Sequence, residues 1–153
     1  MSKPANALLL CLLAATLGVL LAACPPAMGN VDWAAKSEQV YTKLPDATEA
    51  TKLAEHGEKL FNSQACGSCH ATGAARGGLM GPPLGGVGAA VTSRHAGDEL
   101  AARRWMYKHI RDPQKWPGPH HGSDEYKSSA MPSYRGLQDQ DVSALVEFLW
   151  TLR

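Results

Sequence analysis

The chain has 153 residues, about the length of one domain, and a formal net charge of +1 from 15 Lys and Arg against 14 Asp and Glu. This near-neutral balance argues against nucleic-acid binding, which usually needs a strongly basic face. With 44% hydrophobic and 19% charged residues the chain is unlike a disordered tail, yet an aromatic content of 7% predicts a thin core. Small domains of this kind often depend on a bound group or a cross-link.

The N-terminal segment is typical of an export signal. Lys3 is the only charge before Asp32, and an apolar run of 17 residues extends from Ala7 to Ala23. The run ends in Leu21-Ala22-Ala23-Cys24, which resembles the lipobox of bacterial lipoprotein signals. That resemblance implies a signal peptide at residues 1–23, removed before Cys24, whose sulfur then carries a diacylglycerol.

Two alternatives to lipidation are open. Ala27-Met28-Gly29 offers an ordinary cleavage site, and the apolar run has the minimum length for an uncut membrane helix. All three interpretations export the rest of the chain to the extracytoplasmic or periplasmic side of a bacterial membrane. Cleavage before Cys24 would remove Cys11 and, with lipid on Cys24, leave only Cys66 and Cys69 as thiols. Two cysteines at this spacing make a poor structural disulfide but a good attachment pair.

Residues 24–46 are expected to be a lipid-anchored spacer ahead of a domain at residues 47–153. The spacer contains three prolines and has weak apolar periodicity, which favours a tether that lifts the domain off a membrane. Trp33 and Tyr41 either dock onto the domain or lie at the lipid surface. An arm without a role is the remaining interpretation.

Three helices are predicted from apolar periodicity, and no strand pattern is present. The first begins near Ala47 and carries Gly57 on its apolar stripe, at a cost of about 1 kcal/mol relative to Ala. The second spans Asp98–Arg111 and ends at Asp112-Pro113, and the third runs from about Gln138 to Leu152. The sequence therefore predicts an all-α domain.

The motif with the clearest chemical role is Cys66-Gly67-Ser68-Cys69-His70. Cysteines at positions i and i+3 lie near each other on one helical turn, so both sulfurs can bond the two vinyl groups of a porphyrin, and the adjacent histidine can bind the iron. A zinc half-site and a thiol redox pair are the alternatives. Zinc needs four ligands and the sequence has no second Cys pair, and a thioredoxin-like fold needs strands that are not predicted.

From about Leu53 to Arg153 the chain resembles the class I cytochromes c, which are small all-helical monohaem electron carriers. The resemblance implies that the N- and C-terminal helices cross around one covalently bound haem c, with Gly57 against Phe148 or Trp150. The matching residues are Gly57, Phe61, the Cys66–His70 motif, Gly81-Pro82-Pro83-Leu84, Met131-Pro132 and the closing helix Leu145–Leu152.

The resemblance also implies the ligands of the iron. His70 binds from one side, with its other ring nitrogen held by the carbonyl of Pro82, and Met131 binds from the other side. Met80 is too close to His70 in sequence to reach the opposite face, and Met106 is read as a core residue. The alternative sixth ligands are the two imidazoles of His120-His121, which would lower the reduction potential.

Other candidate residues are assigned less specific roles. His56 is expected at the surface and His109 in the core. Arg104, Lys108 and Arg111 share one helix face, which is read as a solvated face or as a docking patch for an acidic partner. The candidate donors to the haem propionates are Arg94, Trp105, Trp116 and Tyr134.

The function expected from these features is single-electron transfer between respiratory redox proteins by a membrane-anchored, exported cytochrome. With both axial positions of the iron filled, no small-molecule substrate is expected, and the chain is interpreted as an electron carrier and not as an enzyme. Two alternatives are a fixed haem c subunit of an oxidase or reductase complex, and a haem enzyme or gas sensor with an open sixth site.

Overall fold

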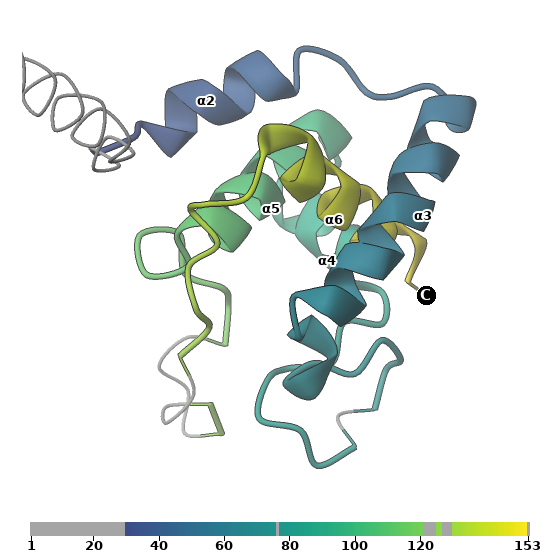
Figure 1. Cartoon of the computed structure of the whole chain (residues 1–153), viewed down its shortest axis with the longest axis vertical. Helices are drawn as coiled ribbons and strands as arrows, with labels where there is room; N and C mark the ends of the chain where they lie inside the picture. Colours follow the sequence, from purple (N-terminus) through teal and green to yellow (C-terminus); the bar gives the residue numbers. More distant parts are fainter. Residues whose placement is uncertain (1–29, 76, 121–124, 127–129, 153) are drawn as a thin grey trace, which may run out of the picture. The chain divides into compact units, whose positions relative to one another are not determined.

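The computed structural model describes residues 30–75, 77–120, 125–126 and 130–152 (Figure 1). Residues from Asp32 onward form one compact unit. The predicted signal peptide at residues 1–23, the predicted lipidation site Cys24, and His121 lie outside the described residues.

Helices make up all the regular structure of the described residues, and this part of the chain has no strand, as the sequence predicts. The elements are α2 (Trp33–Val40), α3 (Ala47–Ser63), the short 3₁₀ helix η1 (Cys66–Ser68), α4 (Val87–Arg94), α5 (Glu99–Arg111) and α6 (Asp139–Thr151).

The three helices predicted from the sequence are present with nearly the expected bounds. Asp46 caps α3 by accepting a hydrogen bond from the Glu49 amide, and Asp98 caps α5 by accepting from the amides of Leu100 and Ala101. Acidic residues at the start of α6, among them Asp139, suit the positive end of the helix dipole. Capping side chains therefore determine where α3 and α5 begin.

Helices α3 and α6 pack against each other, in agreement with the expected family arrangement (Figure 1). Gly57 of α3 lies at their contact, against Ala144 and Phe148 of α6. A Cβ atom at Gly57 would overlap the carbonyl oxygen of Ala144 and would lie 2.8 Å from the Cβ of Phe148. The rings of Phe61 and Phe148 pack beside this point with their centroids 5.3 Å apart. Of the two aromatic partners expected for Gly57, Phe148 is confirmed, whereas Trp150 packs against Gly88 of α4.

Helices α2 and α4 were not predicted. Helix α2 packs on α5 with Trp33 buried, and the residue that caps its C-terminal end, Tyr41, is buried as well. Of the interpretations left open for these two aromatic residues, docking onto the domain is what the structure shows. Helix α4 packs on α5 and α6 through Val91, which has no exposed surface.

One hydrophobic core joins α2 through α6. Its buried members come from every α-helix, and Met131, Tyr134 and Leu137 of the segment before α6 pack against it. The core therefore fixes both the helices and the segment that contains Met131.

None of the helices in the described part of the chain is long and apolar enough to cross a bilayer.

Candidate functional site

The end of α3 turns sharply into the Cys66–His70 motif. Ala65 has a φ of 58°, in the left-handed region, and this turn reverses the chain into η1. The amides of Cys69 and His70 then donate hydrogen bonds of 3.1 and 3.0 Å to the carbonyl of Cys66. The two sulfurs and the imidazole are consequently carried by one tight turn.

Cys66 and Cys69 are free thiols, and both are half-buried. Burial raises the pKa of the Cys66 thiol, although a hydrogen bond with the Tyr134 hydroxyl opposes the shift. No cluster of three or more His, Cys, Asp or Glu residues suited to a metal ion occurs among the residues described here. Both sulfurs are available for thioether attachment.

His70 is held by the segment that follows the motif. Residues 81–85 pair with residues 69–73 through hydrogen bonds of 2.8 Å from the Gly81 amide to the Cys69 carbonyl and 3.0 Å from the Gly85 amide to the Gly73 carbonyl. This pairing places the Pro82 carbonyl 2.8 Å from His70 Nδ1. Because a carbonyl can only accept, Nδ1 carries the proton and Nε2 keeps a lone pair for a metal ion.

Gly81 leaves the space that the imidazole occupies. A Cβ atom at this position would lie 2.6 Å from His70 Cε1 and 2.8 Å from the carbonyl oxygen of Cys69. These distances are shorter than van der Waals contacts, so a side chain here would push the ring aside. Gly81 is therefore part of the site, because its lack of a side chain leaves room for the His70 imidazole.

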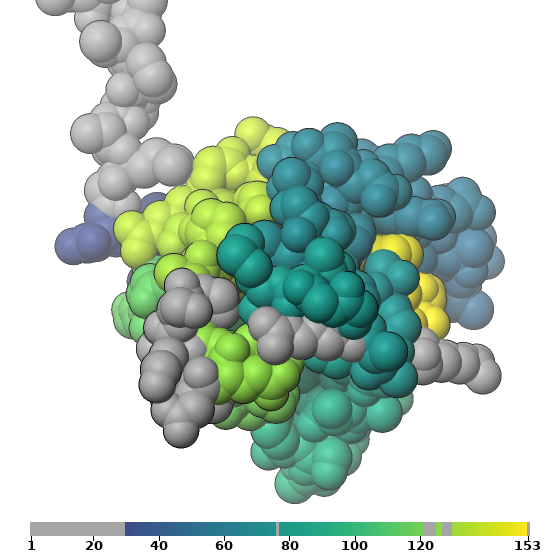
Figure 2. All heavy atoms as spheres, turned by 90° about the horizontal axis from the view of Figure 1, so that it is seen from below, coloured from purple at the N-terminus to yellow at the C-terminus, as the bar shows by residue number. Residues whose placement is uncertain are grey.

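The segment containing Met131 lies next to the attachment turn. The Tyr134 hydroxyl donates a 3.2 Å hydrogen bond to the Gln64 carbonyl and lies 3.9 Å from Cys66 Sγ. Figure 2 shows the teal surface of the segment that follows α3 beside the lime surface of the residues just before α6. Met131, three residues before Tyr134, is half-buried against the core. The structure therefore brings Cys66, one of the two predicted attachment cysteines, close to the segment that contains Met131.

The other candidate ligands have different surroundings. Met80 is 61% exposed, whereas Met106 is 3% exposed within the core, as expected for a core methionine. His109 Nδ1 lies 2.6 Å from the Trp116 carbonyl, and its ring stacks on Trp105 with the centroids 5.0 Å apart. His120 is exposed.

The four candidate propionate donors are distinguished by their existing partners. The Tyr134 hydroxyl already donates to a carbonyl, and the Arg94 guanidinium lies over the Trp105 ring. Trp116 Nε1 is buried and has no hydrogen-bond partner within the part of the chain that the structure describes. An unpaired buried N–H is costly, so Trp116 is the candidate whose donor most needs a partner.

For Arg111, the structure corrects the prediction of a solvated or docking face on α5, whereas Arg104 and Lys108 are partly exposed. Arg111 is 1% exposed, Arg104 Nε donates a 2.9 Å hydrogen bond to the Tyr41 carbonyl, and Lys108 lies over the Trp116 ring. Burial lowers the pKa of Lys108. Helix α2 and the chain after α5 cover part of this face, and neither was predicted to do so.

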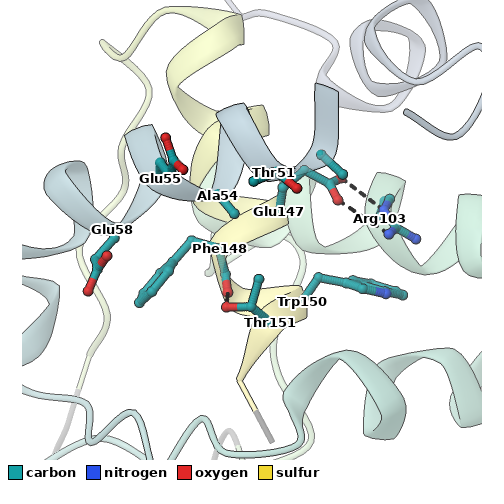
Figure 3. Close-up of a pocket in the computed structure, with 10 residues that line it drawn as sticks. Thr51, Ala54, Glu55, Glu58, Arg103, Glu147, Phe148, Trp150 and Thr151 are labelled. Carbon is teal, nitrogen blue, oxygen red and sulfur yellow. Dashed lines mark hydrogen bonds and ion pairs between the residues drawn. The ribbon is translucent and has the colours of Figure 1, made fainter. Parts of the chain in front are cut away.

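An open groove of about 430 Å³ lies between α3 and α6 (Figure 3). It contains an ion pair in which Arg103 Nε lies 2.8 Å from a carboxylate oxygen of Glu147, with the Arg103 guanidinium 3.7 Å from the centre of the Trp150 ring. None of the residues proposed to bind a cofactor lines this groove. It is separate from the Cys66–His70 site.

Comparisons with known proteins agree with this geometry. A family model described as Cytochrome c matches residues 54–153, which is well over half of the chain. Neither a curated protein nor a solved structure gave a significant match. With its free cysteine pair, its oriented histidine and its all-helical fold, the chain belongs to the cytochrome c family, and its cofactor is covalently attached haem c with iron.

Proposed function

We propose that this chain is a class I, monohaem cytochrome c that passes single electrons between exported redox proteins. The observation that carries the proposal is the 2.8 Å contact of His70 Nδ1 with the Pro82 carbonyl beside two free thiols. It leaves one imidazole nitrogen and two sulfurs for the cofactor. When bound, haem c supplies an iron that alternates between the ferrous and ferric states.

The ligand set follows from the residues around the turn. Cys66 and Cys69 attach the haem, His70 binds the iron through Nε2, and Met131 supplies a sulfur as the sixth ligand. A thioether is a soft donor that favours ferrous iron and raises the reduction potential. If His70 and Met131 both bound the iron, no coordination position would be left for a substrate, which supports a carrier over an enzyme. Trp116 donates its unpaired N–H to a propionate.

Anchoring is the second part of the proposal. The signal peptide at residues 1–23 is removed, Cys24 carries lipid, and the segment after it tethers the haem domain to the extracytoplasmic face of a bacterial membrane. Confinement to a surface raises the local concentration of the carrier near respiratory complexes or smaller electron carriers. Because α2 docks through Trp33, the free tether in this proposal ends before that helix.

The ligand assignment is tested by Met131→Ala. We expect this variant to keep its covalent haem but to lose the weak near-infrared band of methionine-ligated ferric iron and to bind carbon monoxide rapidly when reduced. Met80→Ala is the matched control, because the Met80 side chain is exposed and its loss should leave the band unchanged. An unchanged band in Met131→Ala would show that another residue is the sixth ligand.

Anchoring is tested by Cys24→Ser in a host that lipidates exported proteins. The variant should move from the membrane fraction to the soluble fraction, whereas Cys11→Ser, which changes a cysteine within the signal peptide, should remain with the membrane. A Cys24→Ser protein that stays fully in the membrane fraction with normal processing would contradict the lipidation proposal.

A further inference from the structure

Arg111, near the C-terminal end of α5, is a buried cation with an unusual set of partners. It is 1% exposed. Its Nη1 donates hydrogen bonds to the carbonyls of Tyr134, Arg135 and Leu137, at 3.3 Å, 3.1 Å and a shorter distance, respectively. All three acceptors belong to one four-residue segment between Met131 and α6.

The other side of the guanidinium is fixed by helices. Arg111 Nη2 lies 2.7 Å from a carboxylate oxygen of Asp139 in α6 and 3.2 Å from the Tyr107 hydroxyl in α5. The Trp33 ring of α2 covers the group, with its centre 4.8 Å from Arg111 Cζ. A buried charge is tolerated when it is paired and hydrogen-bonded. Both terminal nitrogens of Arg111 have partners, whereas its Nε has none among the described residues, and the pairing of the terminal nitrogens holds the guanidinium in one orientation.

The same end of α5 holds this segment at two further points. The Tyr134 amide donates a 3.1 Å hydrogen bond to the Ile110 carbonyl, and the Arg135 side chain pairs with the Asp112 carboxylate. Three residues of extended chain span at most about 11 Å, so the Met131 backbone cannot move far from the anchored Tyr134. Anchoring this segment therefore restricts where the Met131 sulfur can lie.

We propose that Arg111 is a positioning residue for the sixth ligand, which holds the Tyr134–Leu137 segment so that Met131 stays on the iron. The inference rests on the proposed assignment of Met131 as that ligand. A purely structural role would require only that Arg111 be satisfied somewhere in the core. Its three carbonyl acceptors instead all lie within six residues of Met131.

Arg111→Lys tests the proposal because lysine keeps the positive charge but lacks the planar guanidinium. Its single ammonium group cannot donate to three carbonyls and to Asp139 at the same time. The probe is imidazole added to the ferric haem protein, since imidazole competes with methionine for iron. If the population with Met131 displaced rises about tenfold, the apparent Kd for imidazole falls about tenfold. Amide hydrogen exchange at Tyr134 and Leu137, which should quicken, provides a readout that does not involve the haem.

Two further variants separate positioning from stability. Trp33→Leu removes the aromatic cover of Arg111 without changing its hydrogen-bonding partners, and should tighten imidazole binding in the same direction by a smaller factor. Val91→Ala, in the fully buried core of α4, destabilises the fold away from this segment and should leave imidazole binding unchanged. If Arg111→Lys does not fold, the comparison of imidazole binding by Trp33→Leu and Val91→Ala decides whether Arg111 positions Met131.

The outcomes are distinguishable from those of the ligand assignment. If Met131→Ala removes the near-infrared band but Arg111→Lys and Trp33→Leu bind imidazole with the affinity of Val91→Ala, the positioning role of Arg111 is wrong and the ligand assignment stands. If Met131→Ala leaves the band unchanged, the ligand assignment itself is wrong. Tighter imidazole binding in Arg111→Lys than in Val91→Ala, together with faster exchange at Tyr134, supports the proposal.

Discussion

His70 and Gly81 show how the lack of one side chain allows an imidazole to be oriented by the backbone. The Pro82 carbonyl lies 2.8 Å from His70 Nδ1, and the backbone at Gly81 passes so close to the imidazole that a Cβ atom there would lie 2.6 Å from His70 Cε1. Proline at position 82 has no N–H of its own, so its carbonyl is the only backbone hydrogen-bonding group that it presents there. Orientation of the ring therefore depends on backbone geometry more than on any charged neighbour.

Gly81→Ala should disturb this arrangement. The added Cβ would lie 2.7 Å from His70 Nδ1 and 2.8 Å from the Cys69 carbonyl oxygen, and the backbone atom cannot rotate away. We expect a loss of about 1–3 kcal/mol in the free energy of unfolding, and a ferric spectrum that shows weakened histidine ligation. Thermal unfolding and absorption spectra measure both effects.

Gly73→Ala is the control for this change. It lies in the same loop region, but a Cβ there meets nothing within 4 Å, so its spectrum and stability should stay close to those of the unmodified protein. Equal stability and equal spectra for Gly81→Ala and Gly73→Ala would mean that the loop moves freely and that the close approach has no consequence.

Residues that act through local spacing could be predicted from the sequence, whereas residues that act through distant partners could not. Cys66, Cys69 and His70 lie on one turn, so their pattern alone indicates attachment. Arg111 acts through carbonyls 23, 24 and 26 positions away and a carboxylate 28 positions away. Its place on one helix face with Arg104 and Lys108 predicted a solvated face or a docking patch, and no local pattern marks it as buried.

At the scale of elements, the crossing of α3 and α6 depends on Gly57. Its α-carbon lies against the backbone of Ala144, which allows the two helices to approach more closely than side chains would permit. The tilted pair of Phe61 and Phe148 extends this contact. The unfavourable glycine within a helix is thereby explained by the packing that it allows.

Gly57→Ala should be destabilising even though alanine is the better helix former. Helix propensity alone would stabilise α3 by about 1 kcal/mol. The clash with the Ala144 carbonyl outweighs this gain because it can be relieved only by separating the helices, and we expect a net loss of about 3 kcal/mol. The melting temperature should fall by on the order of 10 °C, as measured by circular dichroism.

The matched control for the helix crossing is Gly136→Ala, at a position before α6 where a Cβ atom would meet nothing within 4 Å. Its stability should change by less than about 1 kcal/mol. If Gly57→Ala proves as stable as Gly136→Ala, the helices can separate without cost and close contact at Gly57 does not hold the fold.

Helices α2 and α4 could not be recognised from the sequence because both have only eight residues. Two turns are too short for a period of 3.6 residues to be distinguished from chance. In α2 one of the two buried residues is Ser37, and in α4 one is Gly88, so neither helix displays an apolar stripe. Tertiary contacts with α5 stabilise them where propensity does not.

At the scale of the whole molecule, Asp139 connects three helices. Its carboxylate accepts a 2.6 Å hydrogen bond from Tyr107 of α5, pairs with Arg111 of α5, and lies 2.9 Å from Lys36 Nζ of α2. Burial acts to raise the pKa of Asp139, but the hydrogen bonds from Tyr107 and Lys36 and the charges of Lys36 and Arg111 lower it overall. The docking of α2 is thus linked to ionisation of one carboxyl group in α6.

This linkage determines how stability should depend on pH. A carboxyl group whose pKa is lower in the folded state contributes stability above its unfolded value, 3.8, and loses it as the pH falls through the folded value. Between the folded and unfolded pKa values of Asp139, the unmodified protein takes up protons on unfolding. It takes up at most one more proton than the Asp139→Asn variant does. We therefore expect Asp139→Asn to be less stable at neutral pH, with the difference shrinking below pH 3.8.

The difference in the free energy of unfolding between the unmodified protein and Asp139→Asn can be measured by unfolding both with guanidinium chloride at a series of acidic pH values. Glu147 titrates in the opposite sense, since burial raises its pKa and its contribution is lost as the pH rises, but it is present in both proteins and cancels in the comparison. Burial raises the pKa of Tyr107 to about 12, so its hydroxyl keeps its proton across the acidic range. A stability difference that stays constant through the acidic range would show that Asp139 supports the three helices through shape alone and not through its charge.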